Sequence, residues 1–405
     1  MMSKVPKIRF KHDDGSDYEE WKNNKLEEIG TFMKGASLSK ADISDTGTPL
    51  ILYGELYTTY NEVAYDIKRK TQATVDNKYF SKIGDVLIPT SGESPEEIST
   101  ATCVMKDGVI LAGDLNIYRS KVDGRVMSYI INHKAKDKIA RIAQGKSIVH
   151  IQAKTVGKVD INYPSDVEEQ EKIADFLSKI DRMIEISKRE ETSLLELKKG
   201  LVQKIFSQEI RFKREDGSNY DAWSEKKLDE VLKEYNDKCE KDGEYEHVSL
   251  TKEGVVPKTE RYERDFLVTS DDKKYRITHL NDICYNPANL KFGVICRNKY
   301  KDSIFSPIYV TFKIIDGSLP EFVELMVTRQ SFIGAALKYQ QGTVYERMAV
   351  SPEDLLSLDV KIPGIEEQMK IVNFFDSIDE CINKTKREIE KYEELKQGLL
   401  QQMFV

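Results

Sequence analysis

The most regular hydrophobic pattern in this chain fills two stretches of about forty residues, 166–206 and 365–404. In both stretches apolar residues recur every three or four positions, which is the period of one face of a helix. Asp166, which follows a Pro-Ser pair, is expected to cap the first helix, and Pro363-Gly364 precedes the second. At 1.5 Å per residue, each helix should be about 60 Å long.

An apolar stripe of this length is too long for one small domain to cover. We therefore expect the two helices to pack on each other as an antiparallel coiled coil, since a whole domain lies between them in the sequence. The polar interruptions Ser187/Thr385 and Lys198/Lys396 recur at matching places and would help to fix the register. The alternative is that each helix packs only on its own domain. The positions expected to pack are Ile173, Phe176, Ile180, Ile184, Leu194, Leu201, Ile371, Phe374, Ile378, Ile382, Ile389 and Leu399.

The chain also repeats itself. Ile-Arg-Phe-Lys at 8–11 returns at 210–213, and Glu-Glu-Gln at 168–170 returns at 366–368, after which the register holds without a gap. The segments between the echoes, roughly 30–160 and 232–360, look almost unrelated. A duplication that keeps its connectors and diverges its globular parts indicates one frame that holds two different readers. We expect globular domains at 1–163 and 208–362, followed by long helices at 164–207 and 363–405.

The two variable segments are typical of mixed α/β structure. Short apolar runs ended by turn residues predict strands, and longer runs predict a helix over 128–143 and another over 321–337. The predicted strands are 49–54, 85–89, 109–113, 246–250, 282–287, 294–296 and 308–312. The expected fold class is therefore mixed α+β, with two globular domains, two long helices and a pseudo-twofold internal repeat. Strand order cannot be read from this pattern.

Composition adds one constraint on the partner. The 405-residue chain has 62 basic and 69 acidic side chains, a net charge of −7, and no basic block. If it binds DNA, it must do so through a local cleft or with a basic partner that supplies phosphate contacts. Five scattered cysteines, the lack of a signal-peptide pattern and the lack of a long apolar run favour a cytoplasmic protein.

The sequence offers no catalytic, metal-binding or cofactor-binding motif. A glycine-rich turn for S-adenosylmethionine, a Walker A sequence and histidines at metal spacing are all missing. Asn-Pro-Ala-Asn at 286–289 superficially resembles the Asn-Pro-Pro-aromatic motif of adenine methyltransferases, but it lacks the second proline and the aromatic residue. We therefore predict a non-catalytic chain.

What remains is polar and aromatic loop chemistry. Arginine, lysine, asparagine and glutamine have the donor and acceptor geometry for base edges, and a solvated loop is the alternative for each position. The candidate DNA-binding residues are Lys34, Ser37, Lys40, Tyr57, Thr58, Asn61, Lys68, Arg69, Lys70, Ser91, Asn116, Tyr118, Arg119, Asn286, Asn289, Lys291, Arg297, Gln341 and Arg347.

These repeats carry a resemblance to a family. Glu-Glu-Gln followed by spaced Ile, Phe and Ile-Asp at 168–181 and 366–379, ending in Leu-Lys-x-Gly-Leu at 197–201 and 395–399, resembles the helical regions of type I restriction–modification specificity subunits. Two variable domains that alternate with these helices match that family over essentially the whole chain. Tyr-Asn-Pro-Ala at 285–288 and Gly-Asp-Val-Leu at 84–87 resemble pieces of its target-recognition domains.

The resemblance implies a function. Each target-recognition domain would read one half of an asymmetric, bipartite site on double-stranded DNA, and the helices would fix the spacing and dock two methyltransferase subunits. S-adenosylmethionine would bind in the methyltransferase, and ATP and Mg would bind in further restriction subunits, with no membrane involved. Two alternatives stay open: a protein–protein scaffold that does not read DNA, and a self-contained modification enzyme.

Overall fold

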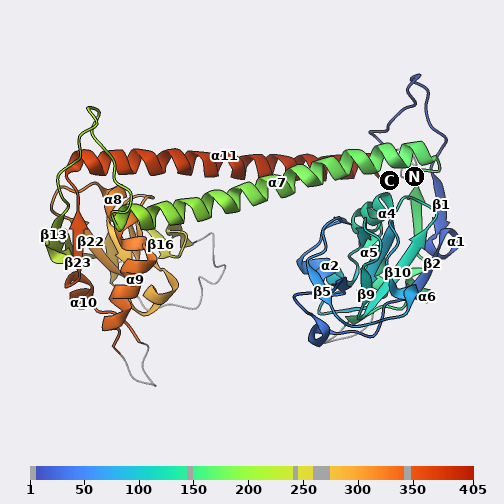
Figure 1. The fold of residues 1–405 in the computed structure, drawn as a ribbon, viewed down its shortest axis with the longest axis horizontal. Helices are drawn as coiled ribbons and strands as arrows, with labels where there is room; N and C mark the ends of the chain where they lie inside the picture. Colours follow the sequence, from blue (N-terminus) through green and yellow to red (C-terminus); the bar gives the residue numbers. More distant parts are fainter. Residues whose placement is uncertain (1–5, 144–148, 240–244, 259–273, 342–347) are drawn as a thin grey trace. The chain divides into compact units, whose positions relative to one another are not determined.

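The computed structural model describes residues 6–143, 149–239, 245–258, 274–341 and 348–405. The chain forms two compact units (Figure 1). The first unit comprises Met1–Arg189 with Lys386–Val405, and the second comprises Glu190–Thr385. Each unit therefore holds one globular domain and a part of both long helices. Among the described residues, no helix is both long enough and apolar enough to cross a bilayer.

The globular domain of the first unit is built on a five-stranded sheet of order β2-β10-β6-β8-β4 and a three-stranded sheet of order β5-β3-β9. Its strands are β1 Lys22–Lys25, β2 Gly30–Lys34, β3 Thr48–Leu52, β4 Val63–Ala64, β5 Arg69–Thr71, β6 Asp85–Pro89, β7 Ser91–Gly92, β8 Thr102–Val104, β9 Ile110–Ala112, β10 Leu115–Ser120, β11 Val149–His150 and β12 Asp160–Tyr163. The three strands predicted here are confirmed as β3, β6 and β9. Strand β10 was not predicted, although it lies between β2 and β6 in the larger sheet.

Helices cover this sheet and close the core. They are α1 Leu26–Ile29, α2 Glu55–Thr58, α3 Pro95–Ile98, α4 Gly124–Ile130, α5 Lys136–Ile142 and α6 Ala153–Val156. The predicted helix 128–143 begins earlier, at Gly124, because Asp123 caps it: the Arg125 amide donates to Asp123 Oδ1 at 2.8 Å. A side chain at position 124 would come within 2.1 Å of the Gly84 carbonyl oxygen, so this close approach requires glycine.

The globular domain of the second unit has a four-stranded sheet of order β14-β22-β19-β20 and a five-stranded sheet of order β15-β18-β21-β16-β17. Its strands are β13 Ser224–Lys227, β14 Leu232–Tyr235, β15 Lys238–Cys239, β16 Glu246–Leu250, β17 Val255–Pro257, β18 Tyr275–Thr278, β19 Ile283–Tyr285, β20 Ile295–Arg297, β21 Ser303–Phe305, β22 Val310–Ile314 and β23 Asp359–Ile362. The four strands predicted here are confirmed as β16, β19, β20 and β22, with β22 shifted by two residues.

The helix predicted over 321–337 is two helices, α8 Pro320–Thr328 and α9 Gln330–Ala336, and α10 spans Pro352–Leu356. The break falls at Arg329, whose backbone is extended. Arg329 Nε donates to the Met326 carbonyl, and its guanidinium lies over the Phe206 ring at 4.2 Å from the ring centroid. Periodicity alone did not reveal this break because both helices present the same apolar face to the core.

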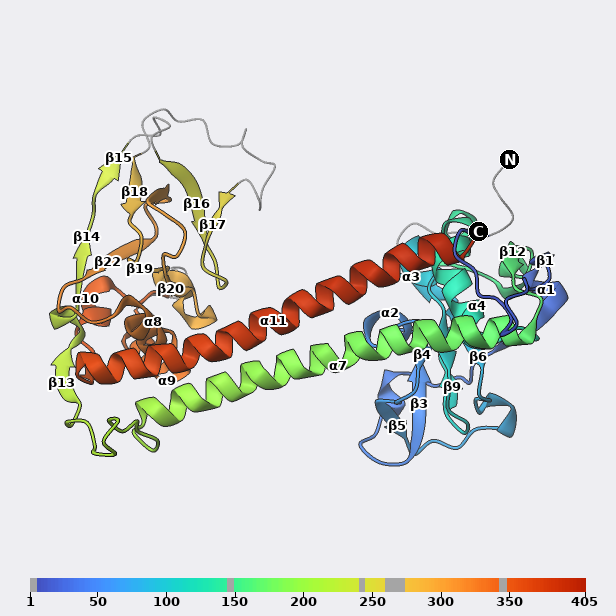
Figure 2. The ribbon, with the colours of Figure 1, turned by 90° about the horizontal axis from the view of Figure 1, so that it is seen from above.

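The two long helices are α7 Val167–Phe206 and α11 Ile365–Met403, as predicted. The predicted cap is confirmed, since the Glu168 amide donates to Asp166 Oδ1 at 2.8 Å. Within each unit, α7 and α11 run alongside each other (Figure 2). In the first unit, Asp181 and Lys188 of α7 contact Lys396 and Glu393 of α11 respectively, so the helices are antiparallel there.

The ends of the long helices also enter the core of each globular domain, so α7 and α11 pack on the domains as well as on each other. Ile173 of α7 and Leu400 of α11 belong to the core of the first unit, and Ile205 and Ile371 belong to that of the second. Phe176 is 37% exposed and packs on Phe10. Of the other expected packing positions, those fully buried are Ile173, Ile180, Ile184, Ile371, Ile382 and Ile389, and those partly buried are Leu194, Leu201, Phe374, Ile378 and Leu399.

The repeated residues form the same latch in both units. Glu169, at the start of α7, is fully buried and accepts from Arg9 Nε at 2.7 Å and from Trp21 Nε1 at 3.3 Å. The same contacts in the second unit join Glu367 to Arg211 (2.7 Å) and Trp223 (3.0 Å). Since a buried carboxylate needs such partners, the chain keeps all three residues in both copies.

The glutamine that follows ties each long helix to its globular domain. Gln170 donates to the Pro164 carbonyl at 2.9 Å and accepts from the Asp123 amide, at the start of α4, at 2.8 Å. Gln368 makes the same two bonds, to the Pro363 carbonyl and from the Leu319 amide at the start of α8. The repeated Glu-Glu-Gln sequence thus supplies the side chains that attach each long helix to its globular domain.

A buried charge cluster joins α11 to the first globular domain. Lys396 Nζ lies 2.7 Å from Glu62 Oε2 and 2.6 Å from Asp181 Oδ1, and His133 Nε2 lies 2.8 Å from Glu62 Oε1. The Tyr129 hydroxyl donates to Asp181. We call these five residues the Lys396 cluster.

The Lys396 cluster predicts an acid-sensitive first unit. Burial alone would raise the pKa of Glu62, but the hydrogen bond with His133 and the charge of Lys396 lower it to about 2. Glu62 therefore contributes stability that is fully present above its ordinary pKa of 4.5 and is lost as the pH falls toward 2. We expect Glu62→Gln to flatten the loss of unfolding free energy between pH 5 and pH 3, measured by denaturant titration.

Asp181 contributes to the pH dependence with the opposite sign. Burial raises the pKa of Asp181 and the charge of Glu62 raises it further, so the Glu62→Gln comparison is made in an Asp181→Asn background. Parallel pH profiles with and without Glu62→Gln in that background would contradict the assignment.

Candidate nucleic-acid interface

Two adjoining cavities mark the first globular domain. One, of about 840 Å³, lies between the end of β2, β10 and the segment that leads into α6, and we call it the β2–α6 cavity. The other, of about 900 Å³, lies beside the turn at Lys40–Asp42 and α2, and we call it the α2 cavity. They share the lining residues Leu38, Gly113 and Asp114, so they form one continuous concave surface.

This surface brings together seven of the candidate residues. Lys34, Ser37 and Asn116 line the β2–α6 cavity, and Lys40, Tyr57, Thr58 and Arg69 line the α2 cavity. The sequence reasoning missed His150, Gln152 and Lys154, which also line the β2–α6 cavity. Their alternating polar pattern over 150–154 is the signal that could have indicated them, but only the fold places them opposite Lys34.

The two cavities differ in charge. Lys34, His150 and Lys154 line the β2–α6 cavity against Asp114, so its rim suits a phosphate. In the α2 cavity, Arg69 Nε donates a hydrogen bond to Glu55 Oε1 at 2.8 Å. Glu93 and Glu97 add two further carboxylates to the lining. Burial raises the pKa of Glu55 despite that ion pair. Carboxylates accept from the cytosine amino group, so the α2 cavity suits base edges better than phosphates.

Four other candidates in this domain lie outside the concave surface or beneath it. The Ser91 hydroxyl is buried and donates to Asp114 Oδ2 at 2.9 Å. Asn61 lines a separate cavity of about 350 Å³ with Glu62 and His133. Lys68 and Lys70 are exposed in and beside β5.

Tyr118 and Arg119 require a correction, because β10 is a central strand rather than a loop. The Tyr118 side chain is fully buried, and its hydroxyl donates to the Leu26 carbonyl at 2.9 Å, so the interpretation of Tyr118 as a DNA contact is wrong. The Arg119 guanidinium donates to both oxygens of Asp85, at 2.9 and 3.1 Å, and to the Phe80 carbonyl. Arg119 therefore holds the start of β6.

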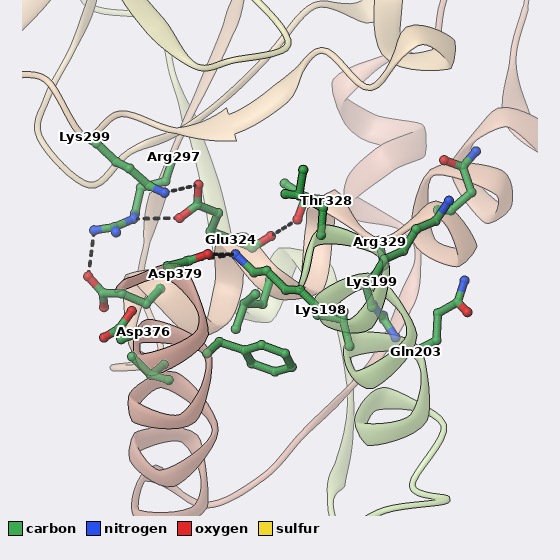
Figure 3. A pocket seen from close by; sticks show the side chains of 17 residues that line it. Lys198, Lys199, Gln203, Arg297, Lys299, Glu324, Thr328, Arg329, Asp376 and Asp379 are labelled. Atoms are coloured by element: carbon green, nitrogen blue, oxygen red, sulfur yellow. Dashed lines mark hydrogen bonds and ion pairs between the residues drawn. The ribbon is translucent and has the colours of Figure 1, made fainter. Parts of the chain in front are cut away.

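In the second unit, Arg297 lines a cavity of about 340 Å³ between α7, α11 and α8 (Figure 3). Its guanidinium donates to Asn281 and Glu321, both at 2.7 Å, and to Glu324 at 3.2 Å. Lys198, which reaches the cavity from α7, pairs with Asp379 at 2.6 Å. These cations are already neutralised, which corrects the expectation that Arg297 is free to contact DNA.

Asn286 also has a structural role. Its side chain is buried, and its Oδ1 accepts from the amides of Ala288 (3.1 Å) and Asn289 (3.3 Å), capping the short helical turn Pro287–Phe292. The resemblance of 286–289 to a methyltransferase motif therefore reflects a capped turn.

One exposed candidate of the second domain, Lys291, lies at the end of that turn. Lys291 and Lys252 lie over the Phe292 ring, at 5.0 and 5.9 Å from its centroid, and Phe292 is 54% exposed. Sequence reasoning missed Phe292, an exposed aromatic ring beside lysines that suits stacking on a base. Gln341 is exposed and donates to Asp354 Oδ2 at 3.3 Å, and Arg347 lies outside the described residues.

Known proteins match this architecture. Residues 18–196 match the family model of the type I restriction modification DNA specificity domain. A Methanocaldococcus jannaschii protein that carries the name of type I restriction enzyme MjaX specificity subunit is 21% identical over 416 aligned residues, covering 94% of this chain and 92% of that protein. The first part of the chain is thus similar to the type I restriction modification DNA specificity domain, and nearly the whole chain is similar to a type I specificity subunit.

Solved structures share the fold of this chain. The type I restriction–modification S subunit from M. genitalium has a TM-score of 0.61 at 14% identity and covers 99% of both chains. A chain from a structural study of complex assembly and conformational transition of the type I R-M system has a TM-score of 0.55 at 12% identity, covering 95% of this chain and 97% of that one.

Proposed function

We propose that this chain is a type I restriction–modification specificity subunit, and that it reads an asymmetric, bipartite site on double-stranded DNA through two unlike domains, which we call readers. The first reader is the globular domain of 1–163, and the second is that of 208–362. The observation that carries the proposal is a contrast. The latch residues that join each domain to its helices are the same in both units, whereas the candidate recognition surfaces differ. After a duplication, selection for a common helical scaffold keeps the latch residues the same, and selection for two different DNA half-sites makes the recognition surfaces diverge.

The long helices 164–207 and 363–405 complete the proposal. As an antiparallel coiled coil they hold the readers at a fixed separation and dock two methyltransferase subunits, which assemble with restriction subunits. S-adenosylmethionine then belongs to the methyltransferase, and ATP and Mg to the restriction subunits. The net charge of −7 supports this arrangement, since basic partners would supply much of the phosphate contact.

Methylation mapping tests the proposal. The full chain is co-expressed with the methyltransferase encoded beside it, in a host that lacks adenine methylation, and modified adenines are located across the genome. We expect one bipartite motif that disappears when this chain is omitted. A soluble complex that produces no motif would contradict the proposal and favour a scaffold that does not read DNA.

Exchanging residues 30–160 for those of another specificity subunit sharpens the test. We expect one half of the motif to change and the other half and the spacer to stay, because each reader recognises its half independently. The matched control exchanges 232–360 and should change the opposite half. A change in both halves after either exchange would contradict independent reading.

A further inference from the structure

The β2–α6 cavity of the first reader contains a buried amide that has no partner. Asn116 is 1% exposed, and among the residues that the structure describes neither its Nδ2 nor its Oδ1 has a hydrogen-bond partner. A buried amide without a partner is unfavourable by roughly 1–3 kcal/mol, so folded proteins seldom keep one without a reason. Asn116 lines the cavity, so this unsatisfied donor and acceptor lie at its wall, covered in this structure.

The fold itself does not require a polar side chain at this place. Strand β10 lies next to β6 in the first unit as β22 lies next to β19 in the second. Asn116 pairs with Ile88, three residues after Asp85, and Val310 pairs with Tyr285, three residues after Asp282.

Asp85 and Asp282 make the same capping contact to the residue three positions before, so the two registers correspond. Val310 is buried in the core of the second unit. A valine therefore fills the corresponding position, and the amide of Asn116 is specific to the first reader.

The rim of the cavity carries cations and flexible side chains. Lys34, the cross-strand neighbour of Asn116, is exposed, as are His150 and Lys154. Within the described part of the chain, no hydrogen bond or ion pair occupies the ammonium groups of Lys34 and Lys154. The Lys34 side chain can reorient within nanoseconds, so it can uncover the amide without a change in the backbone.

We propose that Asn116 is a specificity-determining residue of the first reader, and that its amide pairs with the N6 and N7 edge of an adenine in the target. An asparagine amide presents one donor and one acceptor, which match N7 and the N6 amino group of adenine. Lys34 and Lys154 then contact the backbone phosphates beside that base. This inference rests on the proposed function and names the side chain that reads one base pair of one half-site.

The test compares Asn116→Val with Lys34→Met, both in the full complex with its methyltransferase. We expect Asn116→Val to fold at least as stably as the wild type in thermal unfolding, because valine removes the unpaired amide. We expect its methylation motif to become degenerate at a single A·T position of the half-site that changes on exchange of 30–160. Discrimination at that position should fall by about 5- to 150-fold.

Lys34→Met is the matched control for a phosphate contact. It should weaken binding to every duplex to a similar degree, reduce the salt dependence by about one phosphate contact, and leave the motif unchanged.

A chemical probe checks the atoms involved. In a duplex that carries the mapped site, replacing the adenine by 7-deazaadenine removes the N7 acceptor. The wild-type complex should lose affinity, and the Asn116→Val complex should not.

Two outcomes would overturn the inference and can be told apart. A wild-type bipartite motif that Asn116→Val leaves intact would overturn the role of Asn116 alone. The lack of any motif with the wild-type chain would overturn the proposed function and this inference with it.

Discussion

Replacing Lys396 by methionine is expected to destabilise the first unit by about 3–5 kcal/mol, because the change leaves two buried carboxylates without their shared cation. Lys396 lies between Glu62 and Asp181, and its side chain is only 11% exposed. Removing one partner of such a group costs more than replacing the whole group, since the remaining charges stay desolvated.

The two tryptophans allow the measurement to be made on one unit at a time. Trp21 lies in the first unit and Trp223 in the second, and the chain has no others. In a Trp223→Phe background, fluorescence during denaturant unfolding reports on Trp21, and the comparison is made with and without Lys396→Met.

Lys198 provides the matched control, because it occupies the place of Lys396 in the repeat. Its side chain is 26% exposed and, within the described part of the chain, pairs with Asp379 alone, which is itself 42% exposed. Lys198→Met should therefore cost only about 0–1 kcal/mol in the second unit, followed through Trp223 in a Trp21→Phe background. Equal losses for the two variants would contradict the role of burial. Neutralising the first site with Glu62→Gln, Asp181→Asn and Lys396→Met together should recover stability relative to Lys396→Met alone.

Deleting one heptad from both long helices is expected to shorten the spacer of the target by about 3 base pairs and to leave both half-sites unchanged. Seven residues of helix span about 10 Å, and each base pair of DNA spans about 3.4 Å. Residues 187–193 and 385–391 are equivalent segments of the two repeats, so removing both preserves the hydrophobic seam. Methylation mapping of the variant measures the new spacer directly.

The control for this experiment removes residues 187–193 alone. That deletion shifts one helix against the other by two turns and breaks the ion pairs of the register, so the complex should lose methylation rather than change its spacer. An unchanged spacer after the paired deletion would contradict the proposal that the helices set the separation.

The sequence predicted most of the elements whose signals are local. The long helices, their cap at Asp166 and seven strands follow from periodicity, capping residues and turn residues within a few positions of each element. The repeat also indicated which residues matter to the frame, and the structure gives the reason. Glu169 and Glu367 are buried acceptors that arginine and tryptophan satisfy in the same way.

The sequence could not predict which polar residues are already occupied. Arg297 pairs with glutamates 24 and 27 residues away, and Tyr118 reaches a carbonyl 92 residues away. Strand β10 was mistaken for a loop because its neighbours β2 and β6, which bury it, are remote in sequence. Whether a polar side chain is hydrogen-bonded within the fold depends on partners that are distant in the sequence. The sequence alone therefore cannot separate side chains with a structural role from those that are available to a ligand.

By itself, then, the sequence determined the duplicated frame, the long helices and the resemblance to a family, because periodicity and repetition can be read directly from the order of the residues. Only the tertiary structure distinguished Asn286, whose carbonyl oxygen caps a turn, from Asn116, whose amide lies buried and unpaired in a cavity. The two side chains are chemically identical, and their difference lies in which groups the fold brings within hydrogen-bond distance.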